Sequence, residues 1–304
     1  MTAGLASPRG SLAGLRDLLG ELGDLKRIRS AGRSGSIAER AFLTAWSALM
    51  AGDTLTSVMR TTTARALAAA RLGDLDDAKL RELGLANDEC RSVLGRALDD
   101  VTAGVDSALV DTLRGAFHWQ HADAPPPRFA VALAAQPRAG ATCPGKPRLV
   151  LEPAENHGEH CWAVAVYGVL LASHYVADPE VVFLAGLAHH LHNAFMPDSG
   201  FTGEVLLGDH LDRFCAAATS RALEELPDGL RRDVVEARKI LSDASTPEGR
   251  AFHAADVVDR VLQLSQHLRP ASLSMRDLLV DWELVHDGPV KPFHDRVLAE
   301  IGLA

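Results

Sequence analysis

The chain contains 304 residues, of which 47% are hydrophobic and 23% charged, so it can bury a full-size core and is not disordered as a whole. Only 5% of the residues are aromatic, while alanine and leucine are abundant, and this composition favours helices over sheets. The net charge is −9, and residues 151–304 carry 24 acidic but only 12 basic side chains. We therefore expect no nucleic-acid polymer as a partner, because such a surface repels phosphate groups.

The apolar runs are too short to cross a membrane, and the N-terminal residues lack the pattern of a secretory signal. We therefore expect a cytoplasmic protein without a membrane partner. The four cysteines show no CxxC spacing, which argues against a disulfide framework and against a structural zinc knuckle. The sequence leaves the oligomeric state open, and a homo-oligomer is compatible with it.

In the first part of the chain, residues 1–35 are expected to form a flexible N-terminal segment. This segment contains a short helical pattern over residues 12–28, followed by a glycine-rich break. Ser36 is a candidate helix cap, and Glu39 would complete its capping box. Apolar residues then recur at helical spacing, which predicts a helical N-terminal domain over residues 36–118.

Residues 119–156 differ in character, because they contain seven of the fifteen prolines. Proline at this density breaks helices, so we expect a proline-rich connector. Two short runs in it, residues 129–133 and 148–151, read as extended segments that could pair as a hairpin. Helical spacing returns at His157, which predicts a second helical domain over residues 157–304 and an all-α fold for the chain.

Candidate metal ligands are concentrated in three helical segments of the second part. They lie in Glu155-Asn-His-Gly-Glu159-His160-Cys-Trp162, in His189-His190-Leu191-His192-Asn193, and in Phe252-His253-Ala-Ala-Asp256. The intervening residues are apolar, so the helices are expected to be buried. Buried helices that present imidazoles and carboxylates at one point can build a metal site in the core of a bundle.

This arrangement resembles the HD-domain superfamily of metal-dependent phosphohydrolases, most closely its branch of 5′-deoxyribonucleotidase-like enzymes. The family pattern has a first helix reading E-x-x-x-E-H-x-W, a second ending in H-D-x-x-E-x-x-x-x-D, and a later helix carrying A-D. The residues that match it are Glu155, Glu159, His160, Trp162, His189, Asp198 and Ala255-Asp256. The resemblance covers about residues 150–270 and implies an HD-like helical bundle.

The chain departs from the family pattern at two positions. His190 replaces an aspartate that is a metal ligand in the family, and Asn193 replaces an acid with a general acid–base role, which an amide cannot fill. Imidazole still binds divalent metals, so the resemblance implies the ligand set His160, His189, His190 and Asp256. A set so rich in nitrogen favours Fe, Co, Ni, Zn or Mn over Mg.

The resemblance also implies roles for further residues around the metal. Without the acid of the family, Asp198 or His192 would have to supply the catalytic base. The residues expected to bind the substrate are Glu159, Trp162, Asn193, His253 and His210.

Three functions are compatible with these motifs. The first is a metal-dependent hydrolase of a small, anionic, phosphorylated metabolite or nucleotide. The second is a non-catalytic or repurposed HD-like binding protein. The third is an oxygenase with a single iron acting on a small molecule, since two irons would need the bridging aspartate that His190 replaces. Metal content would separate them: a redox-inert ion supports hydrolysis, iron with oxygen-dependent spectral changes supports oxidation, and no metal supports the binding protein.

Overall fold

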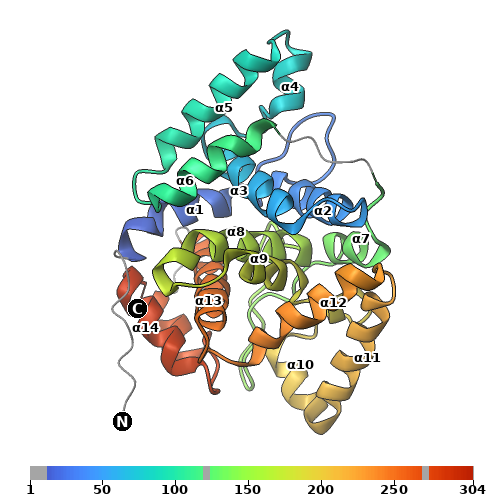
Figure 1. Cartoon of the computed structure of the whole chain (residues 1–304). Helices are drawn as coiled ribbons and strands as arrows, with labels where there is room; N and C mark the ends of the chain where they lie inside the picture. The colour runs from blue at the N-terminus through green and yellow to red at the C-terminus, as the bar shows by residue number, and fades with distance from the viewer. Residues whose placement is uncertain (1–11, 119–123, 269–273, 304) are drawn as a thin grey trace, which may run out of the picture.

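The computed structural model describes residues 12–118, 124–268 and 274–303. Most of these residues are helical, which confirms the expected all-α fold. Figure 1 shows α8 and α9 in the middle of the molecule, with α1 to α6 on one side and α10 to α14 on the other. In the described residues, no helix combines the length and apolar character that a bilayer crossing requires.

The α-helices of the described residues are α1 (Arg16–Asp24), α2 (Ile37–Met50), α3 (Leu55–Leu72), α4 (Asp77–Glu82), α5 (Asn87–Val101), α6 (Ser107–Arg114), α7 (Arg128–Ala135), α8 (His157–Tyr175), α9 (Pro179–Ala188), α10 (Gly200–Leu207), α11 (Leu211–Leu223), α12 (Asp228–Ala237), α13 (Pro247–Leu268) and α14 (Lys291–Ile301). Short 3₁₀ or π turns lie before or between them: η1 (Leu12–Leu15), η2 (Gly115–His118), η3 (Leu191–Ala194), η4 (Gly208–His210), η5 (Arg238–Ser242) and η6 (Asp277–Asp281).

Helix α8 is the central helix, because almost all of its side chains are buried. A capping box starts it: the Asn156 side chain accepts a hydrogen bond from the Glu159 backbone, and the Glu159 side chain accepts one from the Asn156 backbone, each at 2.8 Å. The helix is apolar on all sides, as is typical of a helix that other helices surround. It contacts α9, α13, α2, α7 and α3, so a side chain on its first turn lies deep inside the protein.

Helices α8 and α9 approach each other closely at two glycines. A Cβ atom on Gly186 would lie 2.6 Å from the Cα of Ala165, and one on Gly168 would lie 2.4 Å from a methyl group of Val182. These contacts need residues without side chains. The close approach brings the C-terminal end of α9 next to the first turn of α8.

One hydrophobic core includes residues from both predicted domains. Leu19, Leu22 and Leu25 of the N-terminal segment are fully buried in it together with residues of α2, α3, α8, α9 and α13. Residues 12–28 therefore pack against the core instead of forming the flexible segment expected from the sequence, whereas residues 1–11 lie outside the described residues. The division into domains stays a prediction.

The connector corrects one expectation. Residues 129–133 belong to helix α7 and are not extended, because Pro127 precedes the helix and Phe129, Ala130 and Leu133 form a buried face on it. No hairpin between residues 129–133 and 148–151 forms. In the described part of the connector, Ala141 and Leu149 form an antiparallel pair, with reciprocal backbone hydrogen bonds of 3.0 and 2.9 Å.

Candidate metal centre

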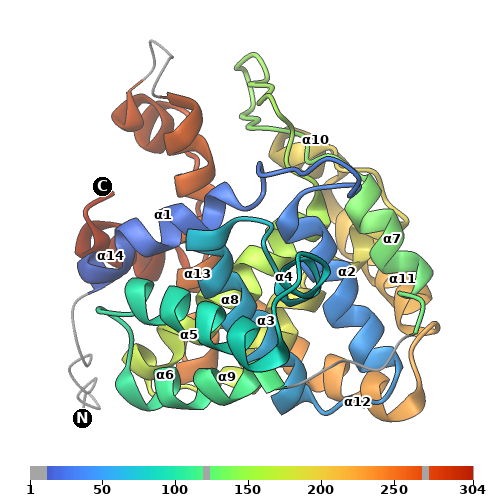
Figure 2. The ribbon, with the colours of Figure 1, turned by 90° about the horizontal axis from the view of Figure 1, so that it is seen from above.

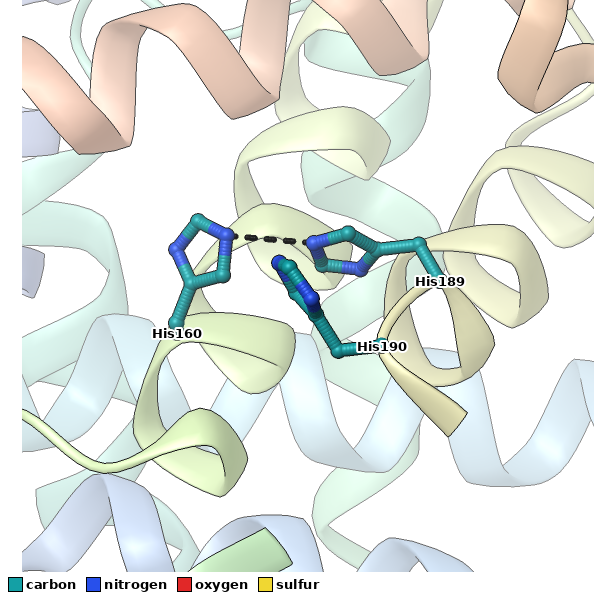
Figure 3. A group of neighbouring side chains, drawn as sticks. All are labelled: His160, His189 and His190. Atoms are coloured by element: carbon teal, nitrogen blue, oxygen red, sulfur yellow. Dashed lines mark hydrogen bonds between the residues drawn. The ribbon is translucent and has the colours of Figure 1, made fainter. Parts of the chain in front are cut away.

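Three of the four predicted ligands converge between α8 and α9. His160 lies on the first turn of α8, His189 is the residue after α9, and His190 follows it (Figure 3). One nitrogen of each ring lies within 4.8 Å of a nitrogen of each other ring. The Nε2 atoms of His160 and His189 are 3.1 Å apart. Two ligands of one tetrahedral ion with bonds of about 2.1 Å are about 3.4 Å apart, so this separation suits a shared ion.

The fourth predicted ligand, Asp256, reaches the cluster from α13. Its Oδ1 atom lies 3.2 Å from Nε2 of His160, although it does not belong to the group of three rings within 4.8 Å of one another. Its Oδ2 atom accepts a hydrogen bond from Arg260 at 2.9 Å. Oδ1 is buried and has no hydrogen-bond donor among the described residues. One buried carboxylate oxygen is therefore left to point at the histidines.

The second ring nitrogen of each histidine is already used. Nδ1 of His160 lies 2.8 Å from the Asp259 carboxylate, and Nδ1 of His189 lies 2.7 Å from the carbonyl oxygen of Gly186. Both partners only accept hydrogen bonds, so we assign the ring hydrogen to Nδ1 in each case. Metal-binding histidines usually have such a partner, which leaves the Nε2 lone pair for the ion.

His190 follows the same rule with an amide as its partner. Its Nδ1 atom lies 2.8 Å from Oδ1 of Asn193, whose Nδ2 atom donates to the carbonyl oxygen of Met196 at 3.3 Å. The amide is oriented by the second bond, so Asn193 accepts from His190. Asn193, predicted to bind substrate, thus orients a predicted ligand while also lining the neighbouring cavity.

Around Nε2 of His160, the lone pairs of His189 and Asp256 therefore meet without a hydrogen between them. A cation, either a proton or a metal ion, is needed to relieve this repulsion. Burial and then the charge of His160 lower the pKa of His189 well below its usual value, so a neutral His189 offers its Nε2 lone pair to a cation. The donor set fits a metal ion.

A buried charge network lies behind His160, and sequence reasoning missed three of its members, Lys26, Asp259 and Arg138. Lys26, two residues after the end of α1, places its Nζ atom 2.6 Å from both Glu155 and Asp259. Burial by itself would lower the pKa of Lys26, but Asp259 and Glu155 raise it. Glu155 also pairs with Arg138 of the connector at 3.1 Å. The network fixes the Asp259 carboxylate between Lys26 and Nδ1 of His160.

A sequence signal existed for Asp259 but not for Lys26. Asp259 follows Asp256 by three positions, which places both carboxylates on one face of α13. Lys26 stands in a leucine-rich stretch and carries no motif. It is only 4% exposed, which its charge does not predict from the sequence.

Two residues of the predicted substrate pocket instead join the helices. Glu159 is fully buried, and its carboxylate accepts hydrogen bonds from the Asn156 backbone and from the Ser36 hydroxyl. Trp162 is 1% exposed and lines a different, smaller cavity between α2 and α3. Neither lines the cavity beside the histidines.

Two further predicted substrate contacts lie away from the cluster. His253 is buried between α13 and α14, where its ring centroid lies 5.5 Å from that of His294. His210 is exposed on η4, and its ring centroid lies 6.1 Å from that of Phe214. The structure brings neither residue to the metal cluster.

Both predicted bases lie near the cluster, but neither is a strong base at neutral pH. Asp198 accepts hydrogen bonds from the backbones of Ala139 and Gly200, each at 2.8 Å. Burial alone would raise the pKa of Asp198, but these bonds and His157 lower it strongly. The His192 ring centroid lies 5.6 Å from that of His190, and burial and Arg238 lower the pKa of His192 to about 4.

A cavity of about 410 Å³ opens beside the cluster. It is bounded by the connector, α10, α13 and the segment that follows η6, and in Figure 2 the connector and this segment rise from the same side of the molecule. Its polar lining residues include His157, His190, Asn193, Asp198, Arg138 and Arg260. His190 is the predicted ligand that borders the cavity. A ligand in the cavity would therefore approach the metal from the side of His190.

The sequence favours a surface or capping role for His157, yet this residue is buried between the cavity and the cluster. It is 1% exposed, and its ring centroid lies 4.9 Å from that of His190. Its Nε2 atom lies 3.5 Å from Asp198, and neither ring nitrogen has a hydrogen-bond partner among the described residues. Its position one turn before His160 was the available sequence signal.

Comparison with protein-family models, with curated proteins and with solved structures finds no match to this chain. Membership of the HD-domain superfamily therefore stays a prediction. It rests on the motif residues.

Proposed function

We propose that the chain is a metal-dependent hydrolase of a small phosphorylated metabolite or nucleotide. The observation that carries this proposal is the meeting of three lone pairs, from His160, His189 and Asp256, at one buried point. A cluster that repels itself without a cation, next to a cavity that contains arginines, suits a metal-dependent reaction of an anionic substrate.

We assign the ion to the three imidazoles, with Asp256 as the carboxylate ligand. Three nitrogens and one oxygen favour Fe, Co, Ni, Zn or Mn over Mg, which prefers oxygen ligands. When bound, the ion would polarise the ester and lower the pKa of its water. In the reaction, the water oxygen forms a bond to phosphorus, the ester P–O bond breaks, and the leaving alcohol takes a proton.

The chain offers few groups for the proton transfer. Asp198 lines the cavity, but its depressed pKa makes it a weak base. His192 has a pKa of about 4 and does not line the cavity. We therefore propose that Asp198, which lines the cavity, is the proton acceptor. Because it is a weak base, we expect slow turnover.

Metal analysis together with phosphate release tests this function. The protein purified without chelator should contain about one divalent ion per chain, and His189→Ala should lose both the ion and the release of phosphate from phosphate esters. His210→Ala is the matched control, because this histidine is exposed and distant, and it should retain both.

Two results would contradict the proposal. Iron whose spectrum changes with oxygen, in a protein that releases no phosphate, would favour the oxygenase. The absence of any metal, with His189→Ala changing stability but no activity, would favour the non-catalytic binding protein.

A further inference from the structure

The cavity beside the cluster contains two guanidinium groups whose hydrogen-bonding capacity is only partly used. Arg138 donates to Glu155 at 3.1 Å, and Arg260 donates to Asp256 at 2.9 Å. Nε of Arg260 has no hydrogen-bond partner among the described residues. A guanidinium has five N–H donors, so both side chains keep donors for an anion.

Both arginines are partly withdrawn from solvent. The Arg138 side chain is 21% exposed and that of Arg260 is 28% exposed. Charge–charge attraction is stronger at such sites than on an open surface, because the effective dielectric constant is lower. The two arginines can therefore bind an anionic group more strongly than exposed arginines would.

The same cavity has a large apolar lining. Its apolar and aromatic residues include Val150, Leu151, Leu264, Trp282 and Leu284. In addition, Phe201 and His286 are stacked on each other, with ring centroids 3.7 Å apart, and both border the cavity. An inorganic anion would leave this lining without a partner.

Charge balance links the cavity to the metal. The network of the site contains three cations, Lys26, Arg138 and Arg260, and four carboxylates, Glu155, Asp198, Asp256 and Asp259, while Glu152 and Glu204 also line the cavity. Without a metal ion the carboxylates are in excess and oppose an anion. A divalent ion would reduce this excess, so anion and metal should each favour binding of the other.

We propose that this cavity binds an organic phosphate ester with an apolar or aromatic body, whose phosphate is held by Arg138 and Arg260 and whose body packs against Trp282 and its neighbours. The proposal names the substrate class of the proposed hydrolase and rests on that function only for turnover. The volume of about 410 Å³ suits a compound of this size, since small-molecule pockets are typically about 300–1,000 Å³.

Calorimetric titration of the full chain with bound Zn²⁺ tests the binding. The probe is 1-naphthylphosphonate, which cannot be hydrolysed, and its two halves are tested as methylphosphonate and 1-naphthol. We expect the complete probe to bind at least tenfold more tightly than either half. Removal of Zn²⁺ should weaken the binding of both phosphonates and leave the binding of 1-naphthol unchanged.

Two variants assign the two chemistries to their residues. Arg138→Gln should weaken 1-naphthylphosphonate at least tenfold and is expected to fold, because Glu155 keeps Lys26 as a partner. Trp282→Ala should weaken the binding of 1-naphthylphosphonate and leave the binding of methylphosphonate unchanged. The control is Arg128→Gln, whose side chain is 93% exposed and lies outside the cavity, and it should bind like the parent.

The outcomes separate this proposal from the proposed function. If 1-naphthylphosphonate binds no better than methylphosphonate, or if a folded Arg138→Gln binds it like the parent, the proposal is overturned. Turnover is measured separately, from the 1-naphthol released by 1-naphthyl phosphate. Binding as expected without turnover would support the proposed binding role of the cavity and contradict the hydrolase function. Turnover that Arg138→Gln leaves unchanged would support the hydrolase function and contradict the binding role of the cavity.

Discussion

His160 and His189 face each other through their Nε2 atoms at 3.1 Å, although Nδ1 of each ring already lies within hydrogen-bond distance of another acceptor. The acceptors are a carboxylate and a backbone carbonyl, neither of which can donate. The pair is therefore set up to share a cation. This relationship depends on residues behind the rings as much as on the rings themselves, and those residues can be tested.

Asp259→Asn should weaken metal binding. The amide can present its NH₂ group to Nδ1 of His160, which would move the ring hydrogen to Nε2 and remove the lone pair that faces the ion. Loss of such a partner lowers metal affinity by about 10–100-fold. Competition between the protein and a chelating dye for Zn²⁺ measures the change. Asp233→Asn, on an exposed position of α12, is the control, and an affinity within twofold of the parent for Asp259→Asn would contradict this tautomer assignment.

Lys26→Met should destabilise the whole protein. Removal of the ammonium group leaves Glu155 and Asp259 buried with less compensation, and breaking a buried ion pair from one side costs about 3–5 kcal/mol. Urea unfolding at neutral pH measures the free energy. Arg29→Met, at an exposed position close in sequence, should change it by less than about 0.5 kcal/mol. Equal values for the two variants would show that the network does not contribute to stability.

Gly186→Ala should both destabilise the protein and disturb the metal site. The added methyl group would lie 2.6 Å from the Cα of Ala165, so α9 must move away from α8. Overpacking of this kind costs about 1–3 kcal/mol. The midpoint temperature of thermal unfolding and the affinity for Zn²⁺ should fall together, because His189 moves with α9.

The control for this helix contact is Gly95→Ala in α5, where a Cβ would meet no atom within 4 Å. It should stabilise the protein by about 0.5–1 kcal/mol through helix propensity. A Gly186→Ala variant that is as stable as the parent and binds Zn²⁺ equally well would show that the helices can separate without cost.

His294 should make the folded state sensitive to acid. Burial lowers the pKa of His294 to about 4 from the usual 6.5, with Asp256 raising it and His253 lowering it. The unfolded chain therefore binds more protons between pH 6.5 and pH 4, and stability is lost as the pH falls through this window. Between pH 7 and pH 5 this histidine should account for about 1–2 kcal/mol of the loss.

Urea unfolding of His294→Asn at both pH values tests this contribution, because the variant should lose less stability on acidification than the parent. His210→Asn, at an exposed position, should keep the slope of the parent. Parallel slopes for the parent and His294→Asn would show that this histidine does not titrate in the window.

The helices that carry the ligands were predictable because their signals are local. The capping box of Asn156 and Glu159 and the start of α9 at Asp178-Pro179 can be read from adjacent residues. Helix α7 was missed because its run of residues is short and follows three prolines, where helical and extended patterns look alike. The cluster of His160, His189 and His190 followed from the motif, but the residues that orient its rings did not.

The orienting contacts could not be read because they join distant parts of the chain. Lys26 and Asp259 are 233 positions apart, and no periodicity relates them. Glu159 and Trp162 matched the motif of the family, yet their side chains face α2 and not the cavity. A motif specifies which residues occur at a site, whereas their directions depend on how the helices pack.

The salt bridge between Lys26 and Asp259 has a consequence for how the protein is made. During synthesis, the lysine leaves the ribosome long before the aspartate that completes its pairing, so the environment of His160 can form only after Asp259 has been made. A fragment of residues 157–304 would carry all four predicted ligands but neither Lys26 nor Arg138. Such a fragment would contain every metal-binding group while lacking the charges that make their burial tolerable.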